Sequence, residues 1–184
     1  SSEDRLRETV EDVIRRARDA NRELNKASRD VEEESKKLNK ELNDRSRKVE
    51  RDLEEVLRRS TDEELARRLE ELRKELRKLN EDANRRSKKL IEELREKNKE
   101  INKRTDKVVK ELKRKLEEVE KRKVPEEVIE RLIRDLRRVL EEIKREIEEA
   151  LRDHERVLKE NEDMVREILR RHEEILKRMT DEIR

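Results

Sequence analysis

One polar pattern recurs along the first two thirds of this chain at a spacing suited to a helix. Two asparagines four positions apart, followed three positions later by a hydroxyl residue, occur as Asn21/Asn25/Ser28 and eighteen residues later as Asn39/Asn43/Ser46. The pattern occurs twice more, again eighteen residues apart, as Asn80/Asn84/Ser87 and Asn98/Asn102/Thr105. Eighteen residues make about five turns at ~3.6 residues per turn, so the copies face the same side of a helix. The repeat predicts long helices with polar clusters set into an apolar stripe.

The apolar residues divide the chain into three such helices. Leu, Ile and Val recur at steps of three and four, with breaks at 60–64 and 123–127, which is the spacing of a helix face. We expect helices over about 2–59, 62–122 and 126–183. Ser1 or Ser2 can cap the first, Thr61 with Glu64 fits a capping box for the second, and Pro125 suits the first turn of the third.

Short connections make consecutive helices antiparallel neighbours. Apolar doublets such as Ile168/Leu169 give the third helix a stripe wide enough to touch two neighbours. The expected fold is all-α: an elongated, antiparallel coiled-coil-like, up-down-up three-helix bundle that forms one domain over 1–184. A repeat of eighteen rather than a strict heptad predicts nearly straight helices.

Composition narrows the class of protein. Of 184 residues, 59% are charged, and there is no glycine and no aromatic residue; natural proteins average ~7% glycine. A mean hydropathy of −1.47 also fits a disordered chain. The apolar periodicity and a net charge of only +2 oppose disorder.

The same numbers oppose several functions. A near-neutral charge gives no basic face for nucleic acid, no apolar run approaches the ~20 residues of a membrane span, and no secretory signal is present. Without cysteine there is no disulfide or thiolate metal site. No nucleophile is paired with a base and no glycine-rich phosphate loop exists. We therefore expect a soluble chain that is not an enzyme and needs no cofactor, nucleic acid or membrane.

The polar clusters can meet in one register. In an antiparallel pair the residue numbers of partners add to a constant, and Ser28 with Asn98 and Ser46 with Asn80 both add to 126. A parallel third helix running 126 residues ahead of the first places His154 opposite Ser28 and His172 opposite Ser46. We predict the layers Ser28–Asn98–His154 and Ser46–Asn80–His172, flanked by the pairs Asn25/Asn102, Asn43/Asn84, Asn21/Thr105 and Asn39/Ser87, with Ser35–Asn161 between the layers.

Satisfying hydrogen bonds is the physical reason for such sets, since a buried polar group without a partner costs about 1–3 kcal/mol. Any slip of the helices would leave these groups unpaired, so we interpret them as residues that fix register. A metal site is not expected. His154 and His172 lie ~27 Å apart at helical rise and cannot share an ion. If both are buried and neutral, stability should fall on acidification.

The whole chain resembles computationally designed helical bundles with built-in hydrogen-bond networks. The resemblance rests on the glycine-free helices, the Glu/Lys/Arg surface, the helix starts Thr61-Asp62-Glu63-Glu64 and Val124-Pro125-Glu126-Glu127, and the polar layers. It implies a monomeric or oligomeric scaffold without enzymatic activity. Paired asparagines and histidines depart from layers of Ser, Thr and Gln alone, and they keep a pH-responsive or partner-exchanging role open.

Three readings of function follow. A hydrophobic share of 29% is about what three two-sided stripes consume, which favours a self-contained monomeric scaffold. The alternative is an interaction or switch module that pairs with another helix or copy, with His154 and His172 as pH-responsive groups. A natural lipid-binding helical protein is opposed by the mixed-sign polar face and the lack of aromatic residues. The sequence does not indicate a localisation.

Overall fold

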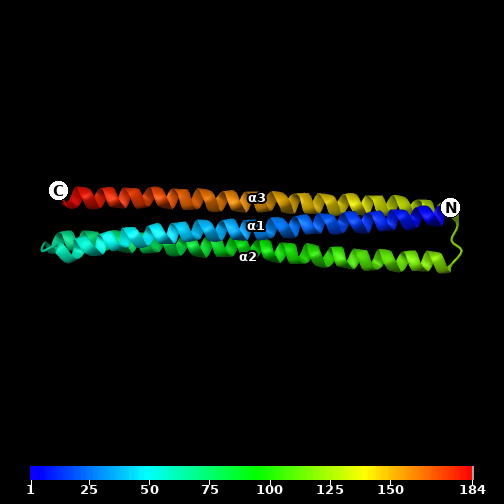
Figure 1. Cartoon of the computed structure of the whole chain (residues 1–184), viewed down its shortest axis with the longest axis horizontal. Helices are drawn as coiled ribbons and strands as arrows, with labels where there is room; N and C mark the ends of the chain where they lie inside the picture. The colour runs from blue at the N-terminus through cyan, green and yellow to red at the C-terminus, as the bar shows by residue number, and fades with distance from the viewer. Residues whose placement is uncertain (184) are drawn as a thin grey trace. The chain divides into compact units, whose positions relative to one another are not determined.

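The structure is a computed structural model that describes residues 1–183, and it contains three long α-helices (Figure 1). They are α1 (Ser2–Arg59), α2 (Glu63–Lys121) and α3 (Glu126–Ile183), and no strand occurs in the described part of the chain. The helices pack against one another. The predicted all-α three-helix bundle is therefore confirmed, and the helix ends lie within one residue of those expected.

The backbone explains why the chain can do without glycine. None of residues 1–183 has a positive φ angle, and none follows a cis peptide bond. Positive φ is the conformation for which glycine is favoured. Both connections between helices are made from residues with ordinary backbone angles, so no turn in this chain requires glycine.

The first helix begins with the expected cap. The Ser1 hydroxyl oxygen accepts a hydrogen bond from the backbone N–H of Asp4 at 3.3 Å, and the same hydroxyl donates to the Asp4 carboxylate at 2.9 Å. Glu3 and Asp4 place negative charge in the first turn, where it complements the positive end of the helix dipole.

At the start of α2 the predicted cap was wrong. Asp62, not Thr61, caps the helix: its Oδ1 accepts from the backbone N–H of Glu64 at 3.0 Å and of Leu65 at 3.4 Å. The helix starts one residue later than a Thr61 cap requires, so the N–H groups that need an acceptor lie within reach of Asp62. A carboxylate at this position also complements the helix dipole.

Pro125 immediately precedes α3. Its carbonyl accepts the first bonds of the helix, from the backbone N–H of Val128 at 3.0 Å and of Ile129 at 3.2 Å. The missing N–H of proline falls where a helix has no internal partner for it, so the single proline starts α3 at no loss of hydrogen bonding.

The chain divides into two compact units, each containing part of all three helices. The first unit comprises Ser1–Asp30 and Glu93–Glu155. In it α1 runs parallel to α3, since Ser2 bonds Glu126 and Arg5 bonds Glu130, and antiparallel to α2, since Arg7 bonds Glu120. Two apolar clusters fill its core, one around Val10, Val13 and Ile133 and the other around Leu24, Ile101 and Ile147.

The second unit comprises Val31–Glu92 and Arg156–Arg184, and its description here ends at residue 183. It has the same helix directions, because Arg68 near the start of α2 pairs with Glu182 near the end of α3. One apolar cluster of its core surrounds Leu53, Leu69 and Ile175, and the other surrounds Leu42, Ala83 and Val165. In both units the apolar clusters alternate with the polar groups described next.

Candidate functional site

The sixteen polar residues singled out in the sequence all lie at least half-buried. Nine are buried: Asn21, Ser35, Ser46, Ser87, Asn98, Thr105, His154, Asn161 and His172. The other seven are half-buried: Asn25, Ser28, Asn39, Asn43, Asn80, Asn84 and Asn102. Their positions on the inward side of the helices follow from the eighteen-residue spacing, which repeats the face that carries the core leucines.

His154 forms the centre of the polar layer in the first unit. Its Nδ1 lies 2.6 Å from the backbone oxygen of Ala150, and its Nε2 lies 2.8 Å from the side-chain nitrogen of Asn98. A carbonyl oxygen only accepts, so Nδ1 carries the proton and Nε2 accepts from the Asn98 amide. Both ring nitrogens of the neutral imidazole are satisfied.

Ser28 does not join this layer as predicted. Its side chain is half-buried, and within residues 1–183 it makes no hydrogen bond with Asn98 or His154. Ala150 and Asn98 engage the two ring nitrogens of His154, so no ring atom remains for the Ser28 hydroxyl, and Oδ1 of Asn98 is left without a partner. The hydroxyl that the sequence places opposite His154 is therefore replaced by a backbone carbonyl of α3 itself.

His172 is the equivalent residue of the second unit, and here all three predicted members meet. Its Nε2 lies 3.3 Å from the Ser46 hydroxyl and 3.3 Å from Oδ1 of Asn80. The Ser46 hydroxyl donates to the backbone oxygen of Leu42 at 2.7 Å, so it accepts from the ring. Nε2 therefore carries the proton of His172, opposite to the arrangement in His154.

Four further pairs join α1 to α2 and are called the α1–α2 polar pairs below. In the first unit Thr105 donates to Asn21 at 3.3 Å and Asn102 donates to Asn25 at 2.9 Å. In the second unit Asn39 donates to Ser87 at 3.2 Å and Asn84 donates to Asn43 at 3.2 Å. The structure brings together all four predicted pairs, with residue numbers that add to 126 in two of them and to 127 in the two asparagine pairs.

One polar pair joins α1 to α3. The Asn161 amide donates to the Ser35 hydroxyl at 2.9 Å, and both side chains are almost completely buried, at 1% and 0% exposed. A hydrogen bond shielded from water in this way leaves each group dependent on its partner, because the alternative is an unpaired polar atom in the core.

Three buried polar atoms have no hydrogen-bond partner within residues 1–183. They are Oδ1 of Asn98, Oδ1 of Asn161 and Nδ1 of His172. The His172 nitrogen is the one that titrates. A proton there would meet no acceptor, whereas the neutral ring only forgoes a bond to a lone pair.

Burial lowers the pKa of His172, and the positive charge of Arg45 on α1 lowers it further. The geometry gives the same direction, since the charged imidazole needs acceptors at both nitrogens and has them at one. His172 is therefore held in the neutral form by its surroundings.

A group of charged residues beside the polar layer of the second unit was not predicted from the sequence. Arg73 on α2 contacts Glu50 at 3.3 Å and Glu54 at 2.8 Å on α1, and Arg77 donates to Glu50 at 2.7 Å. Arg73 and Glu50 are only 21% and 25% exposed. Burial of Glu50 opposes its ionisation, but the hydrogen bonds from Arg77 and Arg73 outweigh it and lower the pKa of Glu50. In a chain that is 59% charged, no local signal separates these two residues from the solvated majority.

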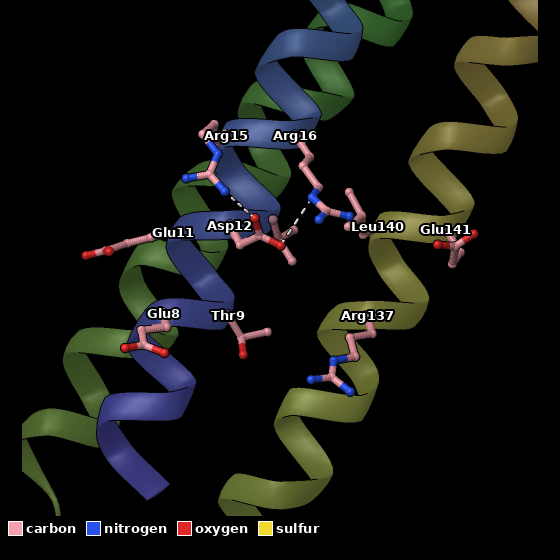
Figure 2. Close-up of a pocket in the computed structure, with 10 residues that line it drawn as sticks. Glu8, Thr9, Glu11, Asp12, Arg15, Arg16, Arg137, Leu140 and Glu141 are labelled. Carbon is pink, nitrogen blue, oxygen red and sulfur yellow. Dashed lines mark hydrogen bonds and ion pairs between the residues drawn. The ribbon is translucent and has the colours of Figure 1, made fainter. Parts of the chain in front are cut away.

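A surface hollow lies in the first unit, between α1 and α3 (Figure 2). Its lining is charged. Asp12 is engaged by Arg15 and Arg16 of the same helix, while Arg137 and Glu141 line the hollow from α3. The Asp12 carboxylate already has two cationic partners, so it offers no unpaired charge to a ligand.

Within residues 1–183 no group of three or more His, Cys, Asp or Glu side chains is arranged to hold a metal ion. None of the three helices, over the same residues, contains an apolar stretch long enough to cross a membrane.

Comparison of the sequence with protein-family models and curated proteins, and of the structure with solved structures, found no match.

Proposed function

We propose that this chain is a structural scaffold, a designed helical bundle in which buried Asn, Ser, Thr and His side chains fix which helices pair and in what register. It carries out no catalysis and requires no cofactor, nucleic acid or membrane. The observation that supports this proposal is the set of polar pairs across α1, α2 and α3. The residue numbers of α1–α2 partners add to 126 or 127, and the α3 partner lies 126 residues beyond its α1 partner.

The register of the helices depends on the difference in free energy between the native pairing and pairings in which one helix has slipped along the other. Leucine side chains on long helices tolerate a slip of one turn, because apolar surface is non-directional and roughly any apolar partner serves. Hydrogen-bonding groups do not tolerate it. If α2 slips by seven residues so that Asn21 lies opposite Leu112, then Asn25, Asn39 and Asn43 lie opposite Val109, Leu94 and Ile91. Each unsatisfied buried group then costs about 1–3 kcal/mol. The pairs therefore act through the states they exclude.

A second candidate function is a pH-responsive switch. The observation that favours it is His172, whose pKa is lowered by burial and by Arg45 and whose Nδ1 has no partner. Protonation would introduce a buried N–H without an acceptor and would weaken the layer that joins α1, α2 and α3 in the second unit.

Disulfide trapping tests the register proposal, because the sequence contains no cysteine. One reporter carries Arg7→Cys with Glu120→Cys, positions whose side chains meet at 2.7 Å. A second carries Ile14→Cys with Glu120→Cys, which become neighbours only if α2 slips by the seven residues that set Asn21 opposite Leu112. We expect the parent chain to oxidise in the first reporter alone.

The test variant replaces all eight members of the α1–α2 polar pairs by leucine, and is called the all-leucine variant below. We expect it to remain helical and to oxidise in both reporters, because nothing then distinguishes the registers. A matched control exchanges only the two hydroxyl residues, Ser87→Thr with Thr105→Ser, and keeps the single register. If the all-leucine variant oxidises in the first reporter alone, apolar packing sets the register and the proposal is wrong.

A further inference from the structure

The helices α1 and α2 carry nearly the same inward pattern. Shifting α1 by 59 residues superimposes its inward polar residues on those of α2: Asn21 on Asn80, Asn25 on Asn84, Ser28 on Ser87, Asn39 on Asn98, Asn43 on Asn102 and Ser46 on Thr105. Apolar positions follow the same shift, for example Leu6 on Leu65, Val13 on Leu72 and Leu53 on Leu112. The two helices share this inward polar pattern, although most of their other residues differ.

This similarity makes the polar pattern self-complementary. In the chain, Asn21 meets Thr105 and Asn25 meets Asn102. If α1 instead paired antiparallel with α1 of a second copy, Asn21 would meet the Ser46 position and Asn25 the Asn43 position, which carry the same kinds of group. Two copies of α2 would match equally well. The α1–α2 polar pairs therefore set register but do not tell the chain's own helix from that of a second copy.

The charged group in the second unit does make this distinction. Under the 59-residue shift Glu50 superimposes on Val109, and Arg73 on Ile14. In the chain Glu50 pairs with Arg73, while Ile14 and Val109 belong to one apolar cluster. An α1–α1 pair in the same register would set Glu50 against Ile14, and an α2–α2 pair would set Arg73 against Val109. Both exchanged pairs place a charge against an apolar side chain. The larger mismatch falls on Arg73, which would meet Lys113 in place of Glu54, whereas Glu50 would keep one arginine because Arg18 superimposes on Arg77.

The limited exposure of these two side chains makes the mismatch consequential. At the surface an ion pair contributes little, because water solvates each charge alone. Arg73 and Glu50 are about three-quarters or more covered, at 21% and 25% exposed, so a charge without its partner there is poorly solvated. Ser35–Asn161 adds a second distinction, because the shift places Leu94 where Ser35 stands.

We propose that Glu50 and Arg73 are the residues that direct α1 to the α2 of its own chain and prevent helix exchange with a second copy. This inference rests on the proposed function, in which polar contacts govern helix pairing. It assigns partner choice to a contact other than those that set the register, so the two can fail separately.

The test compares self-association of the parent with that of a Glu50→Val/Arg73→Ile variant, which keeps every buried Asn, Ser, Thr and His. The substitutions make the α1–α2 contact apolar on both sides. They also make the exchanged contacts with Ile14 and Val109 apolar. After refolding from denaturant at micromolar concentration, light scattering should give a monomer mass for the parent. The variant should form dimers at least about tenfold more tightly.

A matched control removes an equal number of charges from the same pair of helices. Arg7→Val/Glu120→Ile replaces an ion pair at the end of the first unit whose side chains are 51% and 37% exposed, so that either charge stays solvated without the other. It should stay monomeric like the parent. If the control and the test variant dimerise equally, the association comes from the added apolar surface and not from the loss of the Glu50–Arg73 contact, and the proposal is overturned.

A second readout identifies the helices that meet. A Glu32→Cys substitution places one thiol near the point about which α1 would pair with a second α1, so a disulfide-linked dimer forms readily in the exchanged arrangement alone. We expect this product from the Glu50→Val/Arg73→Ile background and not from the parent. A variant that stays monomeric and forms no disulfide-linked dimer overturns the inference. The two cysteine-pair reporters of register test the proposed function independently.

If circular dichroism shows that Glu50→Val/Arg73→Ile has lost its helix, Ser35→Leu/Asn161→Leu supplies the second route, because it removes the other contact that distinguishes α1 from α2. This variant should also dimerise more tightly than the parent. Parent-like monomer mass in a folded Ser35→Leu/Asn161→Leu variant would then overturn the inference.

Discussion

His154 and His172 occupy equivalent positions of the eighteen-residue repeat, yet their rings carry the proton on different nitrogens. His154 donates from Nδ1 to Ala150 and accepts from Asn98. His172 donates from Nε2 to Ser46 and Asn80, and its Nδ1 has no partner. The repeat in sequence therefore does not produce a repeat in hydrogen bonding, because different acceptors lie within reach of the two rings.

The pH dependence of stability follows from His172. Its pKa is lowered in the folded chain, so above ~6.5 neither state binds a proton there and the full stability is present. As the pH falls below that value the unfolded chain takes up a proton that the folded chain resists, and the free energy of unfolding decreases. Urea denaturation at pH 7.5 and pH 5.5 measures the loss.

The matched variant is His172→Leu, which removes the titrating group. We expect it to lose less stability than the parent between these two pH values, with surface carboxylates contributing equally to both. Glu50 adds a loss at lower pH, since its lowered pKa gives stability that disappears as it is protonated, below ~4.3. An identical slope for His172→Leu and the parent between pH 7.5 and 5.5 would contradict the assignment.

The Asn161–Ser35 pair tests whether partners or polarity matter. Ser35→Ala leaves the buried Asn161 amide without its acceptor and should destabilise the chain by about 1–3 kcal/mol. Adding Asn161→Leu removes the unpaired group, so the double variant should recover most of this loss in denaturant melts. Additive losses in the two steps would mean that the bond itself, rather than the unpaired amide, accounts for the effect.

At the scale of the helix, the cap of α2 gives the sharpest prediction. Asp62→Ala removes the acceptor for the backbone N–H groups of Glu64 and Leu65. It should lower the free energy of unfolding by about 1 kcal/mol, typical of a lost N-cap. Thr61→Ala is the control and should change it by less than ~0.5 kcal/mol. Equal effects from the two substitutions would restore Thr61 as the cap.

Apolar packing supplies most of the stability of each helix. Leu53 is fully buried in its cluster, so Leu53→Ala should destabilise the chain by about 2–5 kcal/mol. Val128, which is 40% exposed, serves as the comparison, and Val128→Ala should have an effect below ~0.5 kcal/mol. Thermal and urea unfolding measure both, and a small effect at Leu53 would show that the core is looser than its burial indicates.

The elements were predictable from sequence because their signals are periodic. Leucine spacing, the breaks at Ser60 and Pro125 and the Asn repeats determine three helices and the partners of most polar residues. Choices between chemically similar neighbours were not predictable. Thr61 and Asp62 are both good caps, and a backbone carbonyl competes with Ser28 for His154. Glu50 and Arg73 were missed because their burial depends on where three helices meet, which composition does not encode.

In the whole molecule, three different sets of residues have three different roles. Apolar clusters supply stability, the α1–α2 polar pairs set register, and the Glu50–Arg73 contact selects the partner helix. Because the sets are distinct, variants in one should leave the other two tasks intact. The all-leucine variant should be at least as resistant to urea as the parent, since replacing both members of a polar pair by apolar groups is close to neutral or stabilising.

The claim that polar pairs set the register is tested most directly by a distance measurement between spin labels on two helices of one unit. Labels at the exposed positions Arg22 on α1 and Lys110 on α2 of the first unit report how far one helix has moved along the other. The account predicts one narrow distance distribution for the parent and a broadened or multiple distribution for the all-leucine variant. The same narrow distribution in both would contradict it.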